Sequence, residues 1–242
     1  NCNYFYNLTI DLVNELALFS DIQVNNDMLI EAGPLNTNYT SQYNISVGRN
    51  WTNNGGDPAF LEGAGTVTFF GPNAGDILTP ETFYNMTVNK TYTGFDGLEV
   101  MSVPVVVSNN LNIPDGTLEL NSNTVFTTGG NVNISSGAGL NAGGSDSNIE
   151  LYIGGNWTNN NTSYNTIAGY TPGGEIITFN GSLDQVITTA APQEDFNDFV
   201  VNKPGGAVKP ADNIQILGTF DIFSGNFYYQ VTGLTHYLHG NM

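Results

Sequence analysis

The chain has 242 residues, of which 40% are hydrophobic and 11% are charged. Its 22 acidic and 4 basic residues give a formal net charge of -18, so it lacks the clustered cations that nucleic-acid binding requires. The hydrophobic content is enough for a packed core, which excludes a disordered polar tract. No apolar run approaches the roughly 20 residues of a membrane-spanning helix, so we expect no membrane insertion.

The composition favours strands and turns over helices. Gly occurs 29 times, Pro 10 times, and Asn at about one position in seven, and all three residue types interrupt helices and form turns. Cys2 is the only cysteine, so no internal disulfide can form. Short apolar alternations such as residues 103–107, 118–120 and 149–153 are separated by these turn residues, which predicts an all-β fold.

Three sequence blocks recur in the same order along the chain. They occupy residues 5–10, 83–88 and 196–201 for a Phe-Tyr-Asn block, 48–54 and 154–160 for a Gly-x-Asn-Trp-Thr-Asn-Asn block, and 65–71 and 175–181 for an apolar block that ends in Gly. Blocks in a constant order identify a repeat protein. We divide it into unit 1 (residues 1–82), unit 2 (83–195) and a partial unit 3 (196–242).

The unequal unit lengths favour a solenoid. From Phe5 to Phe83 the distance is 78 residues, and from Phe83 to Phe196 it is 113 residues. A β-sandwich has fixed strand partners, whereas a solenoid can add a turn. We therefore predict a right-handed parallel β-helix that forms one continuous β-solenoid, with tandem β-sandwich repeats as the alternative. Asn side chains at inward or corner positions are expected to form amide ladders from turn to turn.

The block order resembles the repeats of large surface and secreted proteins of Bacteroidota over nearly the whole chain. The matching motifs are Gly-Asn-Trp-x-Asn-Asn, Thr-Val-Thr-Phe-x-Gly and Phe-Tyr-Asn-Leu-Thr-Ile-x-Lys. The resemblance implies an extracellular β-solenoid stalk of the type IX-secreted kind, found in adhesins and filaments. Met242 stands where a Trp would recur, and Asp198-Phe199 depart from the Phe block, which indicates that the last unit has diverged or is cut.

The repeat also predicts which residues are structural. Residues placed identically in each unit normally pack the interior, so we interpret both Trp residues as core rather than as platforms for sugars. Tyr92, Tyr164 and Tyr170 are less constrained and are the candidates for glycan contacts. The predicted structural repeat positions are Phe5, Asn7, Asn50, Trp51, Phe69, Phe83, Asn85, Asn156, Trp157, Phe179 and Phe196.

The candidates for catalysis are weak, and we predict no enzyme and no catalytic residue. A glycosidase needs two carboxylates that face one groove, and many acidic residues could supply them. A polysaccharide lyase would use a cation, and the four cations of this chain stand in unrelated repeat contexts. The carboxylates considered are Asp184, Glu194, Asp195 and Asp198, and the cations are Arg49, Lys90, Lys203 and Lys209.

No cofactor is predicted from the metal-ligating residue types. His236 and His239 have a zinc-like spacing, but no Cys or carboxylate stands nearby in the sequence. Residues 143–146 only faintly resemble a calcium-binding Gly-Asp repeat. Calcium held by loop carboxylates and backbone carbonyls is the one ion left open.

These observations predict a non-enzymatic structural or adhesive segment of a large extracellular cell-surface or filament-forming β-solenoid protein. The alternatives are a polysaccharide-active β-helix enzyme and a module that binds glycan or ice. Thr66-Val67-Thr68 and Thr91-Tyr92-Thr93 are isolated rather than arrayed, which speaks against ice. The chain starts in one block and stops inside another, so we expect further protein at both ends, from a longer chain or from neighbouring copies. Surface glycans are the other expected partner.

Overall fold

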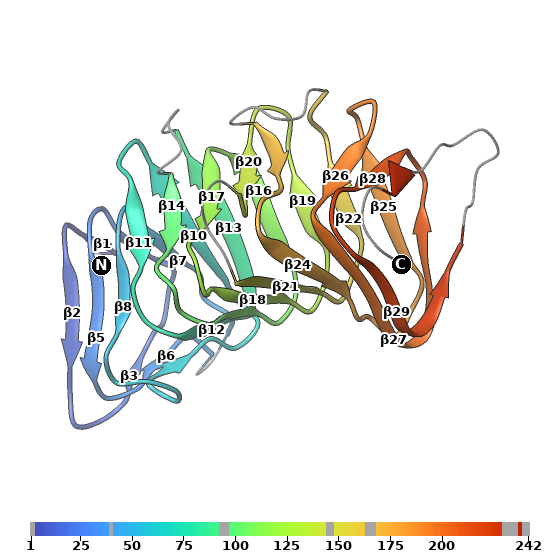
Figure 1. The fold of residues 1–242 in the computed structure, drawn as a ribbon. Helices are drawn as coiled ribbons and strands as arrows, with labels where there is room; N and C mark the ends of the chain where they lie inside the picture. The colour runs from blue at the N-terminus through green and yellow to red at the C-terminus, as the bar shows by residue number, and fades with distance from the viewer. Residues whose placement is uncertain are drawn as a thin grey trace.

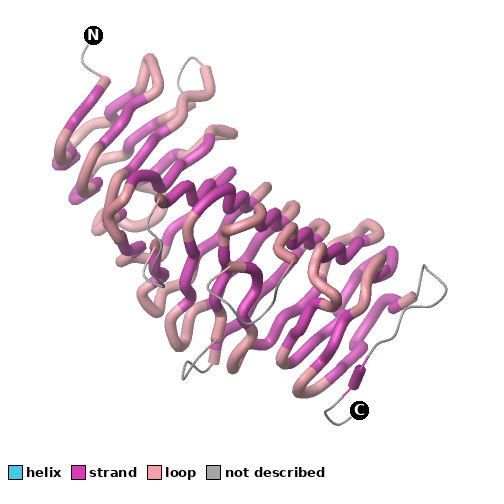
Figure 2. Tube along the Cα trace, turned by 90° about the horizontal axis from the view of Figure 1, so that it is seen from above, coloured by secondary structure: helices cyan, strands magenta, loops and turns pink. Residues whose placement is uncertain are grey.

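The computed structural model describes residues 3–38, 41–91, 97–143, 148–162, 168–228 and 237–238. Within these residues every regular element is a strand, and the chain winds through about nine stacked turns (Figure 1). Neighbouring strands pair in parallel, apart from one isolated antiparallel bridge between Gly143 and Gly173. The turns follow one another along a single axis (Figure 2). The predicted β-solenoid is confirmed, and the alternative of tandem sandwiches is wrong.

Each turn contributes strands to three sheets. Sheet 1 contains β1 (Tyr4–Phe5), β4 (Ile22–Val24), β7 (Ile45–Val47), β10 (Thr66–Gly71), β13 (Asn85–Lys90), β16 (Leu111–Asp115), β19 (Val132–Ile134), β22 (Trp157–Asn159), β25 (Gln185–Thr189) and the end of β27 (Asp198–Pro210). Sheet 2 contains β2 (Leu8–Asp11), β5 (Met28–Ala32), β8 (Trp51–Asn53), β11 (Gly75–Ile77), β14 (Leu98–Val100), β17 (Thr117–Leu120), β20 (Gly139–Asn141) and β23 (Gly169–Thr171), followed by β26 (Glu194–Phe196), β28 (Ile214–Ile216) and β30 (Tyr237–Leu238). Sheet 3 contains β3 (Leu16–Ala17), β6 (Leu35–Asn36) and β9 (Phe60–Leu61), followed by β12 (Glu81–Phe83), β15 (Val105–Val107), β18 (Val125–Thr128), β21 (Ile149–Ile153), β24 (Glu175–Phe179) and the starts of β27 and β29 (Phe220–Phe227). The end of β29 pairs with the end of β27 and so belongs to sheet 1.

Two of the sheets are interrupted once. In sheet 3 the ladder of β3, β6 and β9 ends before β12, and in sheet 2 the ladder that ends at β23 is followed by the separate ladder of β26, β28 and β30. These two breaks lie fourteen strands apart in the strand order, as the recurring blocks also do. The break is therefore a feature of the repeat.

The core follows from the two-residue period of the strands. In β15 the side chains of Val105 and Val107 are fully buried, whereas Val106 between them points outward. The same inward position is occupied in successive turns by apolar residues, so each side chain packs on those above and below it. Burying one such side chain contributes about 1.5–3 kcal/mol.

The recurring blocks lie on different sheets. Trp51 lies on β8 of sheet 2 and Trp157 on β22 of sheet 1, which is fourteen strands later in the described chain. The step from Phe83 on β12 to Phe196 on β26 is also fourteen strands, whereas the step from Phe5 on β1 to Phe83 is eleven. The longer unit therefore contains three more strands, which is the additional turn that its length predicts. Three strands make one turn, and fourteen strands are one strand short of five turns. The second copy is therefore rotated about the solenoid axis by one face relative to the first.

Asn side chains connect the turns at the corner that precedes sheet 1. Each accepts a hydrogen bond at Oδ1 from the backbone N–H of a residue in the next turn. The pairs are Thr66 N–H with Asn44 (2.9 Å), Asn110 N–H with Asn85 (3.3 Å), Asn131 N–H with Asn110 (2.9 Å), Asn156 N–H with Asn131 (2.8 Å) and Val186 N–H with Asn156 (2.8 Å). The predicted corner ladder is confirmed.

A pair of substitutions on β15 tests the inward and outward assignment. Val107→Asp places a carboxylate in the dry interior and should lower the free energy of unfolding by about 4 kcal/mol or more. Val106→Asp places the same group one residue away on the outer face and should change it by no more than about 0.5 kcal/mol. Urea unfolding titrations measure both, and equal losses for the two variants would contradict the assignment.

Candidate functional site

The first cluster of buried polar groups joins Trp51 and Asn53 to a glutamate. Both side chains point inward from β8, because they are two residues apart on one strand. Trp51 Nε1 donates to Glu81 Oε2 at 2.7 Å, and Asn53 Nδ2 donates to the same oxygen at 3.0 Å. Glu81 is the first residue of β12, at the break in sheet 3. We call this Trp–Asn–Glu group cluster A.

An equivalent cluster B lies at the break in sheet 2. Trp157 Nε1 donates to Glu194 Oε1 at 3.2 Å, and Asn159 Nδ2 donates to the two carboxylate oxygens at 3.1 and 3.0 Å. Glu194 is the first residue of β26 and only 2% exposed. The two clusters thus place the same three residue types at equivalent positions of two rotated copies.

Aromatic rings enclose both clusters. Trp51 meets Phe60 edge to face at a centroid distance of 4.9 Å, and Trp157 meets Tyr170 in the same way at 4.9 Å. The Phe of each Phe block completes the group, since Trp51 lies 5.3 Å from Phe83 and Trp157 lies 5.7 Å from Phe196. These contacts cover much of each carboxylate, and they leave Glu81 8% exposed and Glu194 2% exposed.

Burial raises the pKa of both glutamates. The pKa of Glu81 rises to about 7, because burial penalises the charge more than the hydrogen bonds from Trp51, Thr82 and Asn53 favour it. The pKa of Glu194 also rises to about 7, again because of burial, against hydrogen bonds from Thr189, Asn159 and Trp157. Each carboxyl group therefore exchanges a proton near neutral pH.

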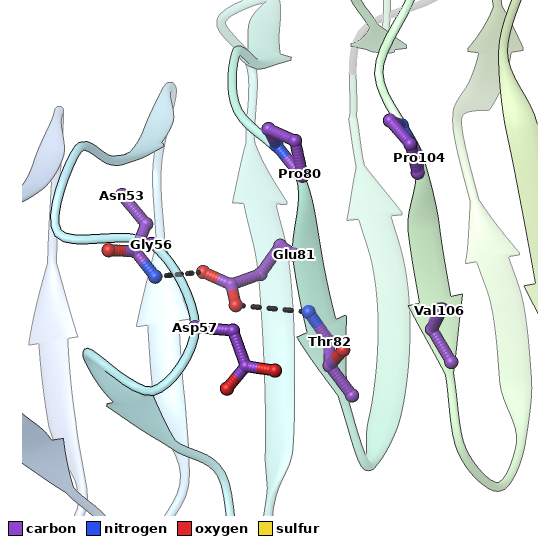
Figure 3. A pocket seen from close by; sticks show the side chains of 8 residues that line it. All are labelled: Asn53, Gly56, Asp57, Pro80, Glu81, Thr82, Pro104 and Val106. Atoms are coloured by element: carbon purple, nitrogen blue, oxygen red, sulfur yellow. Dashed lines mark hydrogen bonds between the residues drawn. The ribbon is translucent and has the colours of Figure 1, made fainter.

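The two clusters differ in what lies beside them. A pocket of about 240 Å³ adjoins cluster A, lined among others by Asn53, Asp57 and Glu81 (Figure 3). In cluster B the Oδ1 of Asn159 accepts hydrogen bonds from the backbone and side chain of Asn161 at 3.1 and 2.9 Å. Gly55 stands where Asn161 stands in the other copy, and Asn53 Oδ1 is buried without a protein hydrogen bond. Cluster A is thus the less completely filled of the two.

Two lysines also occupy equivalent positions, each seven residues after the Phe of a Phe block. Lys90 is buried and donates from Nζ to the carbonyl oxygens of Gly48 (2.7 Å) and Asn73 (2.9 Å), and burial lowers its pKa to about 8. Lys203 donates to Gln185 Oε1, and burial lowers its pKa. The expectation that the cations stand in unrelated repeat contexts is therefore wrong for these two.

The predicted structural positions fall into two groups. Trp51, Trp157 and the Phe residues at 69, 83, 179 and 196 are fully buried, and Phe5 packs against the core from a partly buried position. The Asn residues at 7, 50, 85 and 156 lie at corners, where each accepts a backbone N–H from the next turn. The structure thus places the apolar members inside and the amide members at the corners.

The four carboxylates considered for catalysis do not share one groove. Asp184 pairs with Lys209 beside sheet 1, and Glu194 and Asp195 lie on β26 of sheet 2. Asp198 begins β27 on sheet 3, where its Oδ1 accepts the N–H of Thr219 at 2.5 Å. Asp198 lines a surface groove, which is described below.

Tyr170 was expected to be available for glycan contacts, and this expectation is wrong. It is 2% exposed and packs between Trp157 and Phe196, because β23 turns it into the aromatic group of cluster B. Tyr92, Tyr164, His236 and His239 lie outside the described residues, as does most of segment 143–146. In the described ranges, no three His, Cys, Asp or Glu side chains are grouped so that they could hold a metal ion.

Sequence reasoning missed Glu81 and the buried role of Glu194, although a signal for both exists. Each stands two residues before the Phe of a Phe block, as Glu81-Thr82-Phe83 and Glu194-Asp195-Phe196. The alternation of a strand puts residues two apart on the same face, so a Glu in register with a core Phe must also point inward. Extending the block by two residues would have identified a buried carboxylate.

The outward faces differ in charge. Along sheet 1 the central outward positions of eight successive turns pair in register and are all uncharged; we call them the sheet 1 strip, and they are Gln23, Ser46, Thr68, Thr87, Asn112, Asn133, Thr158 and Thr188. On sheet 2, by contrast, Asp76, Glu99 and Glu119 pair in register in three successive turns. The sheet 1 strip therefore carries no charge, whereas these three outward positions of sheet 2 each carry a carboxylate.

These features define a parallel β-solenoid of imperfect repeats with buried polar clusters at its sheet breaks. The chain matches no protein-family model, no curated protein and no solved structure in the comparisons with known proteins. The likeness to Bacteroidota surface repeats therefore stays a prediction. The described part of the chain also contains no helix that is long and apolar enough to cross a membrane.

The raised pKa of Glu194 predicts a pH dependence of stability. Its pKa is about 7 in the folded protein and 4.5 for an unperturbed glutamate, so the fold binds this proton more tightly than the unfolded chain does. The resulting stabilisation is fully present below pH 4.5 and is lost as the pH rises through 7, by about 3 kcal/mol. Glu194→Gln keeps an acceptor for Trp157 and Asn159, so its unfolding free energy should fall less between about pH 5 and pH 7.5. Urea titrations at the two pH values measure this, and a slope equal to that of the wild type would contradict the assignment.

A substitution at Trp157 tests whether this residue stabilises the core or binds a ligand. Trp157→Ala removes a fully buried ring and one donor to Glu194, and should lower the free energy of unfolding by about 3–5 kcal/mol. Tyr6→Ala, which truncates an exposed aromatic in a recurring block, is the control and should have little effect. Unfolding titrations are run beside a glycan-binding screen, and lost binding with unchanged stability would assign Trp157 to a site.

Proposed function

We propose that this chain is a non-enzymatic structural and adhesive segment of a large extracellular β-solenoid protein. The observation that carries the proposal is the sheet 1 strip, which presents short uncharged side chains in register over eight turns. Parallel strands are spaced about 4.8 Å apart, so the strip is a regular array. Regular faces suit contact with another extended surface.

Charge favours this face for contact. The chain has a net charge of -18, so most surfaces of two copies, or of the chain and an acidic surface, repel each other at short range. Because no strip position carries a carboxylate, an acidic partner can approach this face without bringing like charges together. Apart from Gln23, its side chains are short, and all are half-buried, so little conformational entropy is lost when they are covered.

The buried titratable groups support a structural interpretation. Glu81, Glu194, Lys90 and Lys203 are engaged inside the turns by hydrogen bonds to neighbouring turns. These groups connect one turn to another, and such connections stabilise an extended solenoid. The polysaccharide-active enzyme stays the alternative from the sequence, and a reducing-end assay on neutral and acidic polysaccharides distinguishes it.

Charge introduced into the strip tests the proposal. The double variant Thr87→Asp with Asn133→Asp places carboxylates in the strip, and Thr52→Asp with Thr171→Asp adds the same charge to sheet 2 as a matched control. Circular dichroism verifies that both variants fold. We expect the strip variant alone to lose self-association in sedimentation and adsorption to an uncharged hydroxylated surface in a microbalance, by about tenfold or more.

Two outcomes would contradict the proposal. In the first, the wild-type segment neither associates nor adsorbs at any salt concentration tested. In the second, the strip variant and the sheet 2 control lose the same fraction of adsorption, which would assign the effect to net charge rather than to the face.

A further inference from the structure

A groove of about 340 Å³ crosses the outer face of sheet 3 near its C-terminal turns. Its floor follows one outward position through four strands, because Tyr152 pairs with Thr178, Thr178 with Val200, and Val200 with Asp221. Three steps between parallel strands span about 14 Å. The groove therefore runs along the solenoid axis across β21, β24, β27 and β29, the strands along the lower edge of Figure 1.

Aromatic rings stand at the two ends of this groove. Phe223 points outward from β29 and is 73% exposed, so its ring is presented to solvent rather than packed in the core. Tyr152 at the other end is oriented by its hydroxyl, which donates to Glu150 Oε2 at 2.6 Å. Both rings thus offer apolar faces at fixed places on a rigid sheet.

Hydrogen-bonding groups lie between the rings. Thr178 and Asn202 line the groove with a hydroxyl and an amide, and Asp198 and Asp221 line it with carboxylates, while Val200 provides apolar floor. A site with flat apolar faces at its ends and acceptors between them matches a ligand that alternates C–H faces with hydroxyl groups. Sugars have this chemistry.

We propose that the groove binds a short stretch of a neutral polysaccharide, laid along the solenoid axis. The two carboxylates accept sugar hydroxyls, and together with the net charge of -18 they repel acidic glycans. The residues that line the groove include neither Lys nor Arg in the described part of the chain, so an anionic sugar finds no partner there. This inference rests on the adhesive part of the proposed function, but it concerns a different face from the sheet 1 strip.

Affinity electrophoresis and calorimetry against dextran, xyloglucan and polygalacturonate test the groove. We expect the wild type to bind at least one of the two neutral polymers and not polygalacturonate. Phe223→Ala and Tyr152→Ala should each weaken that binding about tenfold, since each removes one stacking face. Tyr152→Phe keeps the ring and should retain most of it. Phe19→Ala is the matched control, because Phe19 is an exposed aromatic far away on the first turn.

The outcomes separate this inference from the proposed function. Three results would each overturn the proposal that the groove binds neutral polysaccharide. They are absence of binding to both neutral polymers, binding that survives both alanine variants, and equal binding of polygalacturonate. If the groove fails while charge in the strip still abolishes adsorption, the proposed function stands without it. Asp221→Asn offers a second readout that leaves the fold intact, and it should weaken neutral binding without creating binding to polygalacturonate.

Discussion

Every turn of this solenoid is hydrogen-bonded to the turns beside it, so an inward side chain is sealed from water by its neighbours on both sides. The constraint is strict for polar groups, because an unpaired buried donor or acceptor costs about 1–3 kcal/mol. Inward positions are therefore apolar almost throughout, as at Val105 and Val107. Most exceptions are polar groups that bond to one another or to backbone carbonyls, such as Lys90 with Gly48, whereas Asn53 Oδ1 is buried without a protein hydrogen bond.

The Trp–Asn–Glu clusters occupy the places where this backbone ladder stops. At both breaks a glutamate opens the next ladder, and its carboxylate receives donors from a Trp and an Asn that lie on another sheet. Side-chain hydrogen bonds thus connect the turns where strand pairing is interrupted. The cost is a largely buried carboxylate, and burial raises the pKa of both Glu81 and Glu194 to about 7.

The sequence was sufficient for the fold because its signals are local. Two-residue alternation identifies the inward residues, and Gly, Pro and Asn identify corners. The 35 residues by which the second unit exceeds the first (113 less 78) leave room for one further turn of three strands. The clusters were harder to predict from the sequence, because a Glu near a Phe is ordinarily solvent-exposed. Only the recurrence of Glu two residues before the Phe in both copies indicates that it is buried. Tyr170 was misjudged for a related reason: its equivalent in the first copy is Phe60, but Phe60 follows its Trp by 9 residues and Tyr170 follows its Trp by 13, so the sequence does not align them. The groove residues span 72 positions, and only the register of four strands brings them together.

Because the second copy is rotated by one face, equivalent residues of the two copies lie on different sheets. The repeat therefore determines which residues are buried, but not which side chains share an outer face. Thr68 and Thr87 belong to the sheet 1 strip, but their counterparts in the second copy, Thr178 and Val200, form the floor of the groove on sheet 3. Thr158 of the strip corresponds to Thr52, which faces outward from sheet 2. The uncharged character of the strip is therefore assembled from non-equivalent positions of the repeat. Repetition therefore explains the buried clusters but not the uncharged strip, and contact with another surface, as proposed above, is one constraint that would keep a face uncharged across non-equivalent positions.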